Sequence, residues 1–210
     1  MTEHVCVDCG TTFALSAAVR EQYPGWAPKR CRACHARHTG RSSAGAARRV
    51  EEDLTLEEVL QRHHGGPDDG VFTDGAADPN PGPGGWGAVY VVAGAVVDRA
   101  FGHEPHTTNN RMELTALLHG ADLVPPGTPA TVYTDSRLCY DTITRWAAGW
   151  ERRGWRRKGG EIANLDLVQA VYAKFGSRPE LTLQWIKAHE GNRWNEYADA
   201  LATAYRRETL

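Results

Sequence analysis

The pattern of apolar and polar residues becomes regular from residue 71 onward. Short apolar runs and one Val-rich alternating stretch predict strands at residues 71–74, 86–97, 130–134 and 181–186, with Gly94 dividing the second stretch in two. Helical periodicity predicts helices at residues 111–123, 161–175 and 193–207, and Ser136 is placed to cap another. Strands and helices in this order predict an α/β domain with a mixed sheet and helices on its faces.

The first 70 residues have a different character. Residues 39–50 are small, polar and basic, as expected of a flexible tether. Thr55 and Glu58 have the spacing of a capping box that opens a short helix, and the turn-forming, acidic residues after it are most simply a solvated linker. The predicted organisation is a small module in residues 1–40, a linker with a short helix in residues 41–70, and a larger domain in residues 71–210.

Composition limits the class of protein. The 210 residues suffice for one full domain and a small one, but not for three ordinary domains. The longest apolar run, residues 88–97, is about half a membrane span, and the N-terminal residues lack a signal-peptide pattern, so we expect a cytoplasmic protein without a membrane segment. Lys and Arg number 24 against 26 Asp and Glu, but residues 1–50 have a basic surplus, so a polyanionic partner is not excluded.

Four of the five cysteines form two CxxC pairs. The pattern is C-x2-C-x21-C-x2-C, and its members are Cys6, Cys9, Cys31 and Cys34. Two tight turns of this kind can present four thiolates to one tetrahedral Zn²⁺. A reducing cytoplasm disfavours two disulfides, and a redox motif needs only one CxxC. We therefore predict a structural Zn²⁺ that supplies much of the module's folding free energy. The basic surplus suits phosphate contact, and a zinc ribbon that binds a protein partner is the alternative.

Four acidic residues stand where they could meet. Asp74 and Asp135 each end a predicted strand, and Glu113 lies in the first turn of a predicted helix. Asp199 in the last helix could supply a fourth carboxylate. Crowded carboxylates repel one another unless a cation lies among them, and Mg²⁺ is a hard cation that carboxylate oxygens bind. Paired ions of this kind activate a water and stabilise the leaving oxygen in phosphodiester cleavage.

Each acidic residue also has a purely structural interpretation. Glu113 could complete a capping box with Asn110, and Asp135 could simply begin the helix that follows it. Asp74 could belong to a turn, and Asp199 could be a solvated surface acid. Only the joint arrangement of the four favours a metal site over these alternatives.

The joint arrangement resembles the ribonuclease HI family, the type 1 ribonucleases H. The matching segments are Phe72-Thr-Asp74-Gly, Asn80-Pro-Gly-Pro-Gly-Gly-Trp-Gly, Thr107-Thr-Asn-Asn-Arg-Met-Glu113-Leu, Tyr133-Thr-Asp135-Ser, and His189 with Asp199 ten residues later. The resemblance covers residues 71–207 and implies a ribonuclease H-like mixed five-stranded sheet flanked by helices. It also implies endonucleolytic hydrolysis of the RNA strand of an RNA:DNA hybrid, giving 5′-phosphate and 3′-hydroxyl ends. Two Mg²⁺ ions would serve as cofactors, with Mn²⁺ as a possible substitute.

The resemblance further implies roles for individual residues. The residues that correspond to the metal-binding carboxylates are Asp74, Glu113, Asp135 and Asp199. His189 corresponds to a loop histidine that can move a proton or help release product, although a single loop histidine could also be plain surface. The residues expected to contact the hybrid near Glu113 are Asn80, Thr108, Asn109 and Asn110. An amide can both donate to and accept from a 2′-hydroxyl, which marks RNA, whereas Thr108 suits a phosphate of the DNA strand.

A basic and aromatic stretch spans residues 145–158 and resembles the handle with which some bacterial members grip the hybrid. Its candidate substrate contacts are Trp150, Arg153, Trp155, Arg156 and Arg157. Core tryptophans with solvated arginines are the alternative, and we expect the tryptophans to pack while the arginines reach phosphates. Arg137 is a further candidate. It stands where many relatives have glutamine, so contacts with substrate are expected to differ there.

Two other functions compete with a hybrid-specific ribonuclease. One is a non-catalytic nucleic-acid adaptor with the zinc module as its working part, which the complete set of four carboxylates and a histidine disfavours. The other is a transposase-like or integrase-like enzyme, since related folds also gather acidic residues. The asparagine-rich helix entry and the spacing between His189 and Asp199 disfavour that possibility.

Overall fold

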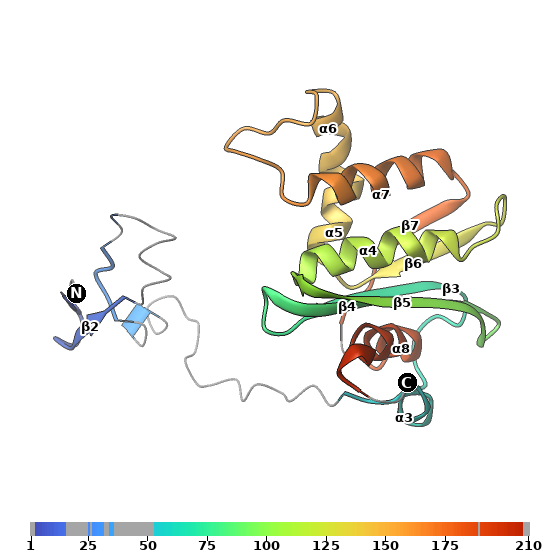
Figure 1. Ribbon diagram of the computed structural model, residues 1–210, viewed down its shortest axis with the longest axis horizontal. Helices are drawn as coiled ribbons and strands as arrows, with labels where there is room; N and C mark the ends of the chain where they lie inside the picture. Colours follow the sequence, from blue (N-terminus) through green and yellow to red (C-terminus); the bar gives the residue numbers. More distant parts are fainter. Residues whose placement is uncertain are drawn as a thin grey trace. The chain divides into compact units, whose positions relative to one another are not determined.

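The computed structural model describes residues 3–15, 25, 27–31, 34–35, 53–188 and 190–207. The chain divides into two compact units, Met1–Glu52 and Asp53–Leu210, whose elements are shown in Figure 1. Within the described ranges, no helix combines the length and the apolar character that crossing a membrane requires.

The larger unit is built on a five-stranded mixed sheet with the strand order β5-β4-β3-β6-β7 (Figure 1). Its strands are β3 (Gly70–Ala77), β4 (Gly82–Val92), β5 (Ala95–Thr107), β6 (Ala130–Thr134) and β7 (Leu181–Trp185). The first three form an antiparallel meander, whereas β6 pairs in parallel with both β3 and β7. Helices connect into β6 and β7, because parallel strands need crossover connections. This sheet confirms the fold class predicted from the sequence.

Helices cover both faces of the sheet (Figure 1). They are α3 (Leu56–Arg62), α4 (Asn109–Asp122), α5 (Arg137–Asp141), the π-helix η1 (Thr142–Trp146), α6 (Ala147–Glu151), α7 (Leu165–Ser177), α8 (Arg193–Ala202) and the 3-10 helix η2 (Ala204–Arg206). One core unites α4, η1 and α7 with the sheet through residues such as Leu117, Val132 and Val171. The other unites α3 and α8 with the opposite face through residues such as Phe72, Val89 and Leu201.

The ends of several elements differ from the sequence prediction. β4 begins at Gly82, four residues before the predicted start of this strand at residue 86, and β5 continues to Thr107 rather than stopping at Val97. β5 is an edge strand with mostly exposed side chains, so its outer half lacks the apolar alternation that identifies strands in a sequence. The helices α7 and α8 are shorter than predicted, because α7 begins only at Leu165 and α8 gives way to a 3-10 turn after Ala202.

The segment before β3 packs against the rest of the larger unit. Thr55 caps α3 through the predicted capping box, in which the amide of Glu58 donates to Thr55 Oγ1 and the amide of Thr55 donates to Glu58 Oε2. Leu56 and Val59 are buried in the core beneath α8. The sequence favoured a solvated linker for residues 63–70, but the indole N–H of Trp194 donates to Asp68 Oδ1 at 3.3 Å. The boundaries of the three predicted parts stay a prediction.

The smaller unit contains a two-stranded antiparallel hairpin, β1 (Glu3–Val5) and β2 (Thr12–Ala14). The turn between them carries the first CxxC pair, and the amide of Gly10 donates to the carbonyl of Cys6 at 2.9 Å. Arg30 forms an ion pair with Asp8 at 2.7 Å, which links the hairpin to the residues before the second CxxC pair.

Candidate metal-binding active site

Three of the four predicted carboxylates meet at one edge of the sheet. Asp74 lies within β3, Asp135 directly follows β6, and Glu113 lies in the first half of α4. One oxygen from each of them lies within 4.8 Å of the others. The strands bring the two aspartates together because β3 and β6 are parallel neighbours, with Thr73 opposite Thr134.

The structural alternatives for these three residues are wrong. Asp74 is a strand residue paired with Gly87, not part of a turn. The helix α4 starts two residues earlier than a capping box at Asn110 requires, and Thr108 is its cap. The cap of α5 is Ser136, which accepts from the amide of Cys139, so Asp135 does not cap the helix that follows it.

A glycine beside Asp74 allows α4 to approach the sheet. A Cβ atom on Gly75 would lie 2.2 Å from the amide nitrogen of Glu113, so no side chain fits between β3 and the start of α4. A glycine also allows a close approach on the other face of the sheet, where a Cβ atom on Gly87 would lie 2.4 Å from the carbonyl oxygen of Ala198 in α8. Glycines at these two positions therefore set the distance from the sheet to both helices that carry acidic residues.

Burial and mutual repulsion raise the pKa values of the central carboxyls. The pKa of Asp74 lies well above its ordinary value because the group is buried, and the charges of Asp135, Glu113 and Asp199 add to this effect. Burial, followed by Asp135 and Asp199, also raises the pKa of Glu113. The Oε2 atom of Glu113 is buried without a hydrogen-bond partner. An unpartnered buried carboxylate oxygen among other acids fits a divalent cation, because the cation supplies both the missing partner and the missing positive charge.

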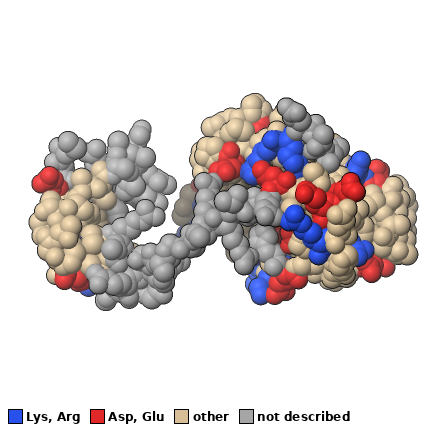
Figure 2. Space-filling model, turned by 90° about the horizontal axis from the view of Figure 1, so that it is seen from below, with Lys and Arg blue, Asp and Glu red and all other residues tan. Residues whose placement is uncertain are grey.

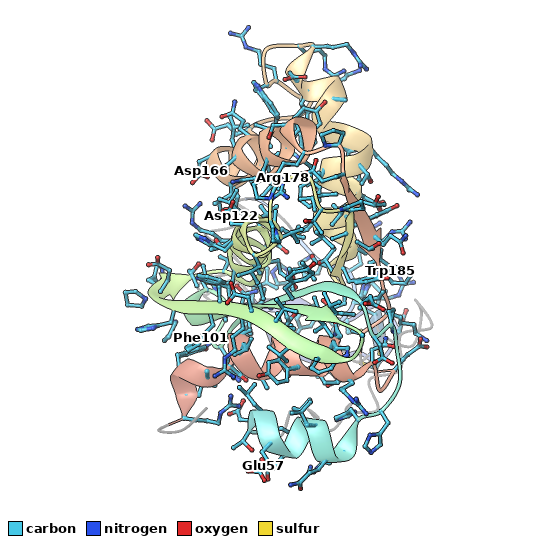
Figure 3. All side chains as sticks on the ribbon, turned by 90° about the vertical axis from the view of Figure 1, so that its right-hand side faces the viewer. Glu57, Phe101, Asp122, Asp166, Arg178 and Trp185 are labelled. Carbon is cyan, nitrogen blue, oxygen red and sulfur yellow. The ribbon has the colours of Figure 1, made fainter. Side chains whose placement is uncertain are left out.

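Two residues that the sequence analysis did not single out hold Asp135 in place. The side-chain amide of Asn195 donates to Asp135 Oδ2 at 3.0 Å, and Asn195 is 2% exposed. The indole N–H of Trp185, at the end of β7 in Figure 3, donates to the carbonyl oxygen of Asp135 at 3.0 Å. Asn195 lies four residues before Asp199 on α8, a spacing that places both on one helix face and could have identified it.

The predicted hybrid-contacting residues at the start of α4 form a connected group. Asn109 accepts from the amide of Ala77 at 2.6 Å, and Asn80 accepts from the amide of Asn109 at 3.3 Å. These bonds join the loop after β3 to the first turn of α4. The side chain of Thr108 caps α4 by accepting from the amide of Arg111, and Asn110 is exposed. The four residues therefore lie together beside the acidic cluster, and their contacts with a nucleic acid stay a prediction.

The basic and aromatic stretch lies on η1, α6 and the turns that follow. Trp150 and Trp155 pack against the core beneath α7, where Trp155 meets the ring of Tyr172 edge-on at 5.9 Å. The arginines Arg153, Arg156 and Arg157 are exposed. This placement matches the expectation of packed tryptophans beside solvent-facing arginines, and leaves phosphate contact by these arginines as a prediction.

Arg137 lies two residues after Asp135 and contacts three neighbouring side chains. Its Nε atom pairs with Asp141 at 3.1 Å, and its guanidinium lies over the rings of Trp185 and Tyr140, 5.1 Å and 5.5 Å from their centroids. Cation–π and ion-pair contacts of this kind orient the side chain next to the site without neutralising the central carboxylates. His189, the predicted loop histidine, lies outside the described residues.

The four predicted zinc ligands also meet. Sulfur atoms of Cys6, Cys9, Cys31 and Cys34 all lie within 4.8 Å of one another, and all five cysteines of the chain are free thiols. Hydrogen bonds from backbone amides, the largest effect coming from Cys31, lower the pKa of Cys6 to about 6, and the hydroxyl and amide of Thr11 lower the pKa of Cys9. Four convergent sulfurs, of which those of Cys6 and Cys9 favour the thiolate form, fit a tetrahedral zinc site.

Comparisons with known proteins identify relatives of the larger unit. Residues 68–207 match the RNase H family model. A curated ribonuclease H from Gluconobacter oxydans (strain 621H) is 44% identical over 140 residues, which cover 66% of this chain and 91% of the relative. The ribonuclease H of Methylorubrum extorquens (strain PA1) is 42% identical over 140 residues, which cover 67% of this chain and 60% of the relative.

Solved structures show the same fold. The crystal structure of LC9-RNase H1, described as a type 1 RNase H with the type 2 active-site motif, is 32% identical with a TM-score of 0.53, and the match covers 67% of this chain and 74% of that one. The N-terminal RNase H domain of rv2228c from Mycobacterium tuberculosis is 25% identical with a TM-score of 0.50, covering 64% of this chain and 89% of that one. The family model covers the part of the chain that contains the acidic cluster, and therefore the chain belongs to the ribonuclease H family.

Proposed function

We propose that the protein is an endoribonuclease that hydrolyses the RNA strand of RNA:DNA hybrids, giving 5′-phosphate and 3′-hydroxyl ends. The observation that carries this proposal is the meeting of Asp74, Glu113 and Asp135, with an unpartnered Glu113 oxygen, in the part of the chain that matches the ribonuclease H family. Asp74, Glu113, Asp135 and Asp199 would hold two Mg²⁺ ions, or Mn²⁺ in their place, which supply the positive charge for activating water and stabilising the leaving oxygen.

The remaining residues of the site would orient the substrate and the acidic side chains. Asn195 and Trp185 fix Asp135 from two sides, so the carboxylate needs little reorganisation when substrate binds. Asn80 and Asn109 stiffen the entrance to α4, where amide groups can distinguish a ribose by its 2′-hydroxyl. His189 would move a proton or assist product release. The arginines of the handle and Arg137 would bind phosphates.

A panel of matched duplexes tests the proposed function. We expect cleavage of RNA in an RNA:DNA hybrid, with the DNA strand intact, and no cleavage of RNA:RNA or DNA:DNA duplexes of the same sequence. The reason is that a hybrid combines one strand with 2′-hydroxyls and one without them. Denaturing gels with each strand labelled in turn measure the result. Cutting of DNA strands would instead favour a transposase-like enzyme.

The cysteine cluster would hold a structural Zn²⁺ in a module that assists binding of nucleic acid or of a protein partner. Its sulfurs converge as a tetrahedral site requires.

Reduced thiols persist in a reducing compartment, so we place the protein in the cytoplasm, which cell fractionation would test.

Removing residues 1–50 is expected to weaken hybrid binding, because this segment has a surplus of basic side chains. The loss in affinity should be larger at low salt, where phosphate contacts contribute most, while the single-turnover cleavage rate at saturating enzyme stays the same. Fluorescence anisotropy across a salt series measures the affinity. An affinity that does not change at any salt concentration would indicate that the module serves a protein partner.

A further inference from the structure

Residues 63–66 run beside the segment that leads into α8. The amide of Gly65 donates to the carbonyl of Gly191 at 3.2 Å, and the carbonyl of Gly65 accepts from the amide of Arg193 at 2.8 Å. These two bonds form a parallel bridge between Gly65 and Asn192. We call residues 63–66 the strap. The family model begins at residue 68, so the strap lies outside the matched part of the chain.

The strap caps α8. The first amides of a helix have no acceptor within the helix and need one from elsewhere. Asn192 precedes α8 but makes no capping hydrogen bond with its side chain. The carbonyl of Gly65 takes this place by accepting from Arg193, the first residue of the helix. The stability of the first turn of α8 therefore depends on a residue 128 positions earlier in the chain.

Side chains reinforce the backbone contacts. The guanidinium of Arg193 donates from Nε to the carbonyl oxygen of His63 at 2.8 Å, and its Nη2 atom lies 2.9 Å from Nδ1 of His64. Just after the strap, Asp68 accepts from the indole N–H of Trp194 at 3.3 Å. The first two residues of α8 are thus joined by their side chains to the segment before β3.

The strap packs tightly against Asn192, the residue that precedes α8. Gly66 has a φ of +93°, and a Cβ atom there would lie 2.7 Å from Oδ1 and 3.1 Å from Cβ of Asn192. A larger residue at this position would have to push Asn192 and the strap apart. Glycine is therefore required both for the backbone conformation and for the close approach.

We propose that the strap positions the amino-terminal part of α8 for the cleavage reaction. This inference rests on the proposed function. Asn195, two residues into the helix from Arg193, holds Asp135 through its hydrogen bond, and Asp199 follows one turn later. A shift of the first turn of α8 would move both residues relative to Asp74 and Glu113. Small displacements of this kind reduce rates more than they reduce binding, because they disturb the geometry of the reacting groups.

Replacement of Gly66 by Ala tests the role of the strap, with Gly127→Ala as the matched control. Gly127 has a similar φ of +78°, but a Cβ atom there meets nothing within 4 Å. Both variants place an alanine at a positive φ, but only Gly66→Ala forces the strap and Asn192 apart. We expect Gly66→Ala to lower kcat on an RNA:DNA hybrid about tenfold with KM changed less than about twofold, and Gly127→Ala to change neither. Hydrogen exchange at the amide of Arg193 should become faster only in Gly66→Ala.

The results separate failure of this inference from failure of the proposed function. If the unaltered protein cleaves hybrids but the two alanine variants have equal kcat, the strap has no positioning role. Unchanged exchange at Arg193 in Gly66→Ala would overturn the inference even if the protein cleaved nothing, whereas absence of cleavage alone would refute the proposed function.

Should Gly66→Ala fail to fold, Arg193→Gln and Arg193→Lys replace it. A few-fold loss of kcat in Arg193→Gln, recovered in Arg193→Lys, supports the inference, and equal kcat in both refutes it.

Discussion

Replacing Asp135 by Asn is expected to reduce hybrid cleavage by about a thousandfold or more. Asparagine has the same shape and can still accept from Asn195, so the fold should persist. It lacks the negative charge that a divalent cation needs, and the cluster with Asp74 and Glu113 would lose affinity for metal. Hybrid binding in EDTA should be unchanged or slightly tighter, because one charge that repels phosphates is gone.

Single-turnover cleavage and fluorescence anisotropy measure the two effects of Asp135→Asn separately. Asp122→Asn is the matched control, since Asp122 (labelled in Figure 3) is an exposed acid whose main contact is an ion pair with Lys174 at 2.6 Å. That variant should cleave at the normal rate, because exposed ion pairs contribute little. Mg²⁺ should raise the melting temperature of the control but not of Asp135→Asn. Unchanged turnover in Asp135→Asn would refute the metal assignment.

Replacing Cys34 by Ser is expected to abolish zinc binding by the smaller unit. The thiolate of Cys34 is one of four convergent sulfurs, and a serine hydroxyl is a poor ligand for zinc at neutral pH. Because metal binding supplies much of the folding free energy of such a small module, about 10–16 kcal/mol in zinc-finger peptides, the module should unfold. Zinc content per chain should fall from about one ion to nearly none, and proteases should cut residues 1–52 much faster.

Cys139→Ala serves as the control for the zinc experiment. Cys139 is also a buried free thiol, but it belongs to the core of the larger unit, where burial raises its pKa to about 12. Zinc content in this variant should be unchanged. Atomic absorption after dialysis measures the metal in both variants. Retention of one zinc ion per chain by Cys34→Ser would contradict the four-sulfur site.

Sequence patterns sufficed where a feature depends on local spacing. The two CxxC pairs, the capping box at Thr55 and Glu58, and the elements that position Asp74, Glu113 and Asp135 were all predicted, although β3 continues past Asp74 to Ala77. Each depends on a short run of residues whose periodicity or spacing is visible without knowledge of the fold. The joint pattern of the acidic segments also identified the family.

Other features were decided only by contacts between distant parts of the chain. The outer half of β5 is a strand because it pairs with β4, although its own residues are mostly polar and exposed. Asn195 acts on Asp135 because α8 packs across β3 and β4, next to the end of β6. Gly65 caps α8 from a segment that the sequence presented as a solvated linker.

Some features could be predicted from the sequence and others could not, because periodicity and spacing depend only on which residues of a segment face solvent and which contact their neighbours in the chain. By itself the sequence therefore determined the family, the sheet-and-helix order, and the acidic and cysteine residues. Hydrogen bonds across 60 or more residues leave no such local signature. The tertiary structure alone decided which side chains hold the carboxylates in place, how closely Gly75 lets α4 approach, and that residues before the family domain complete the first turn of α8.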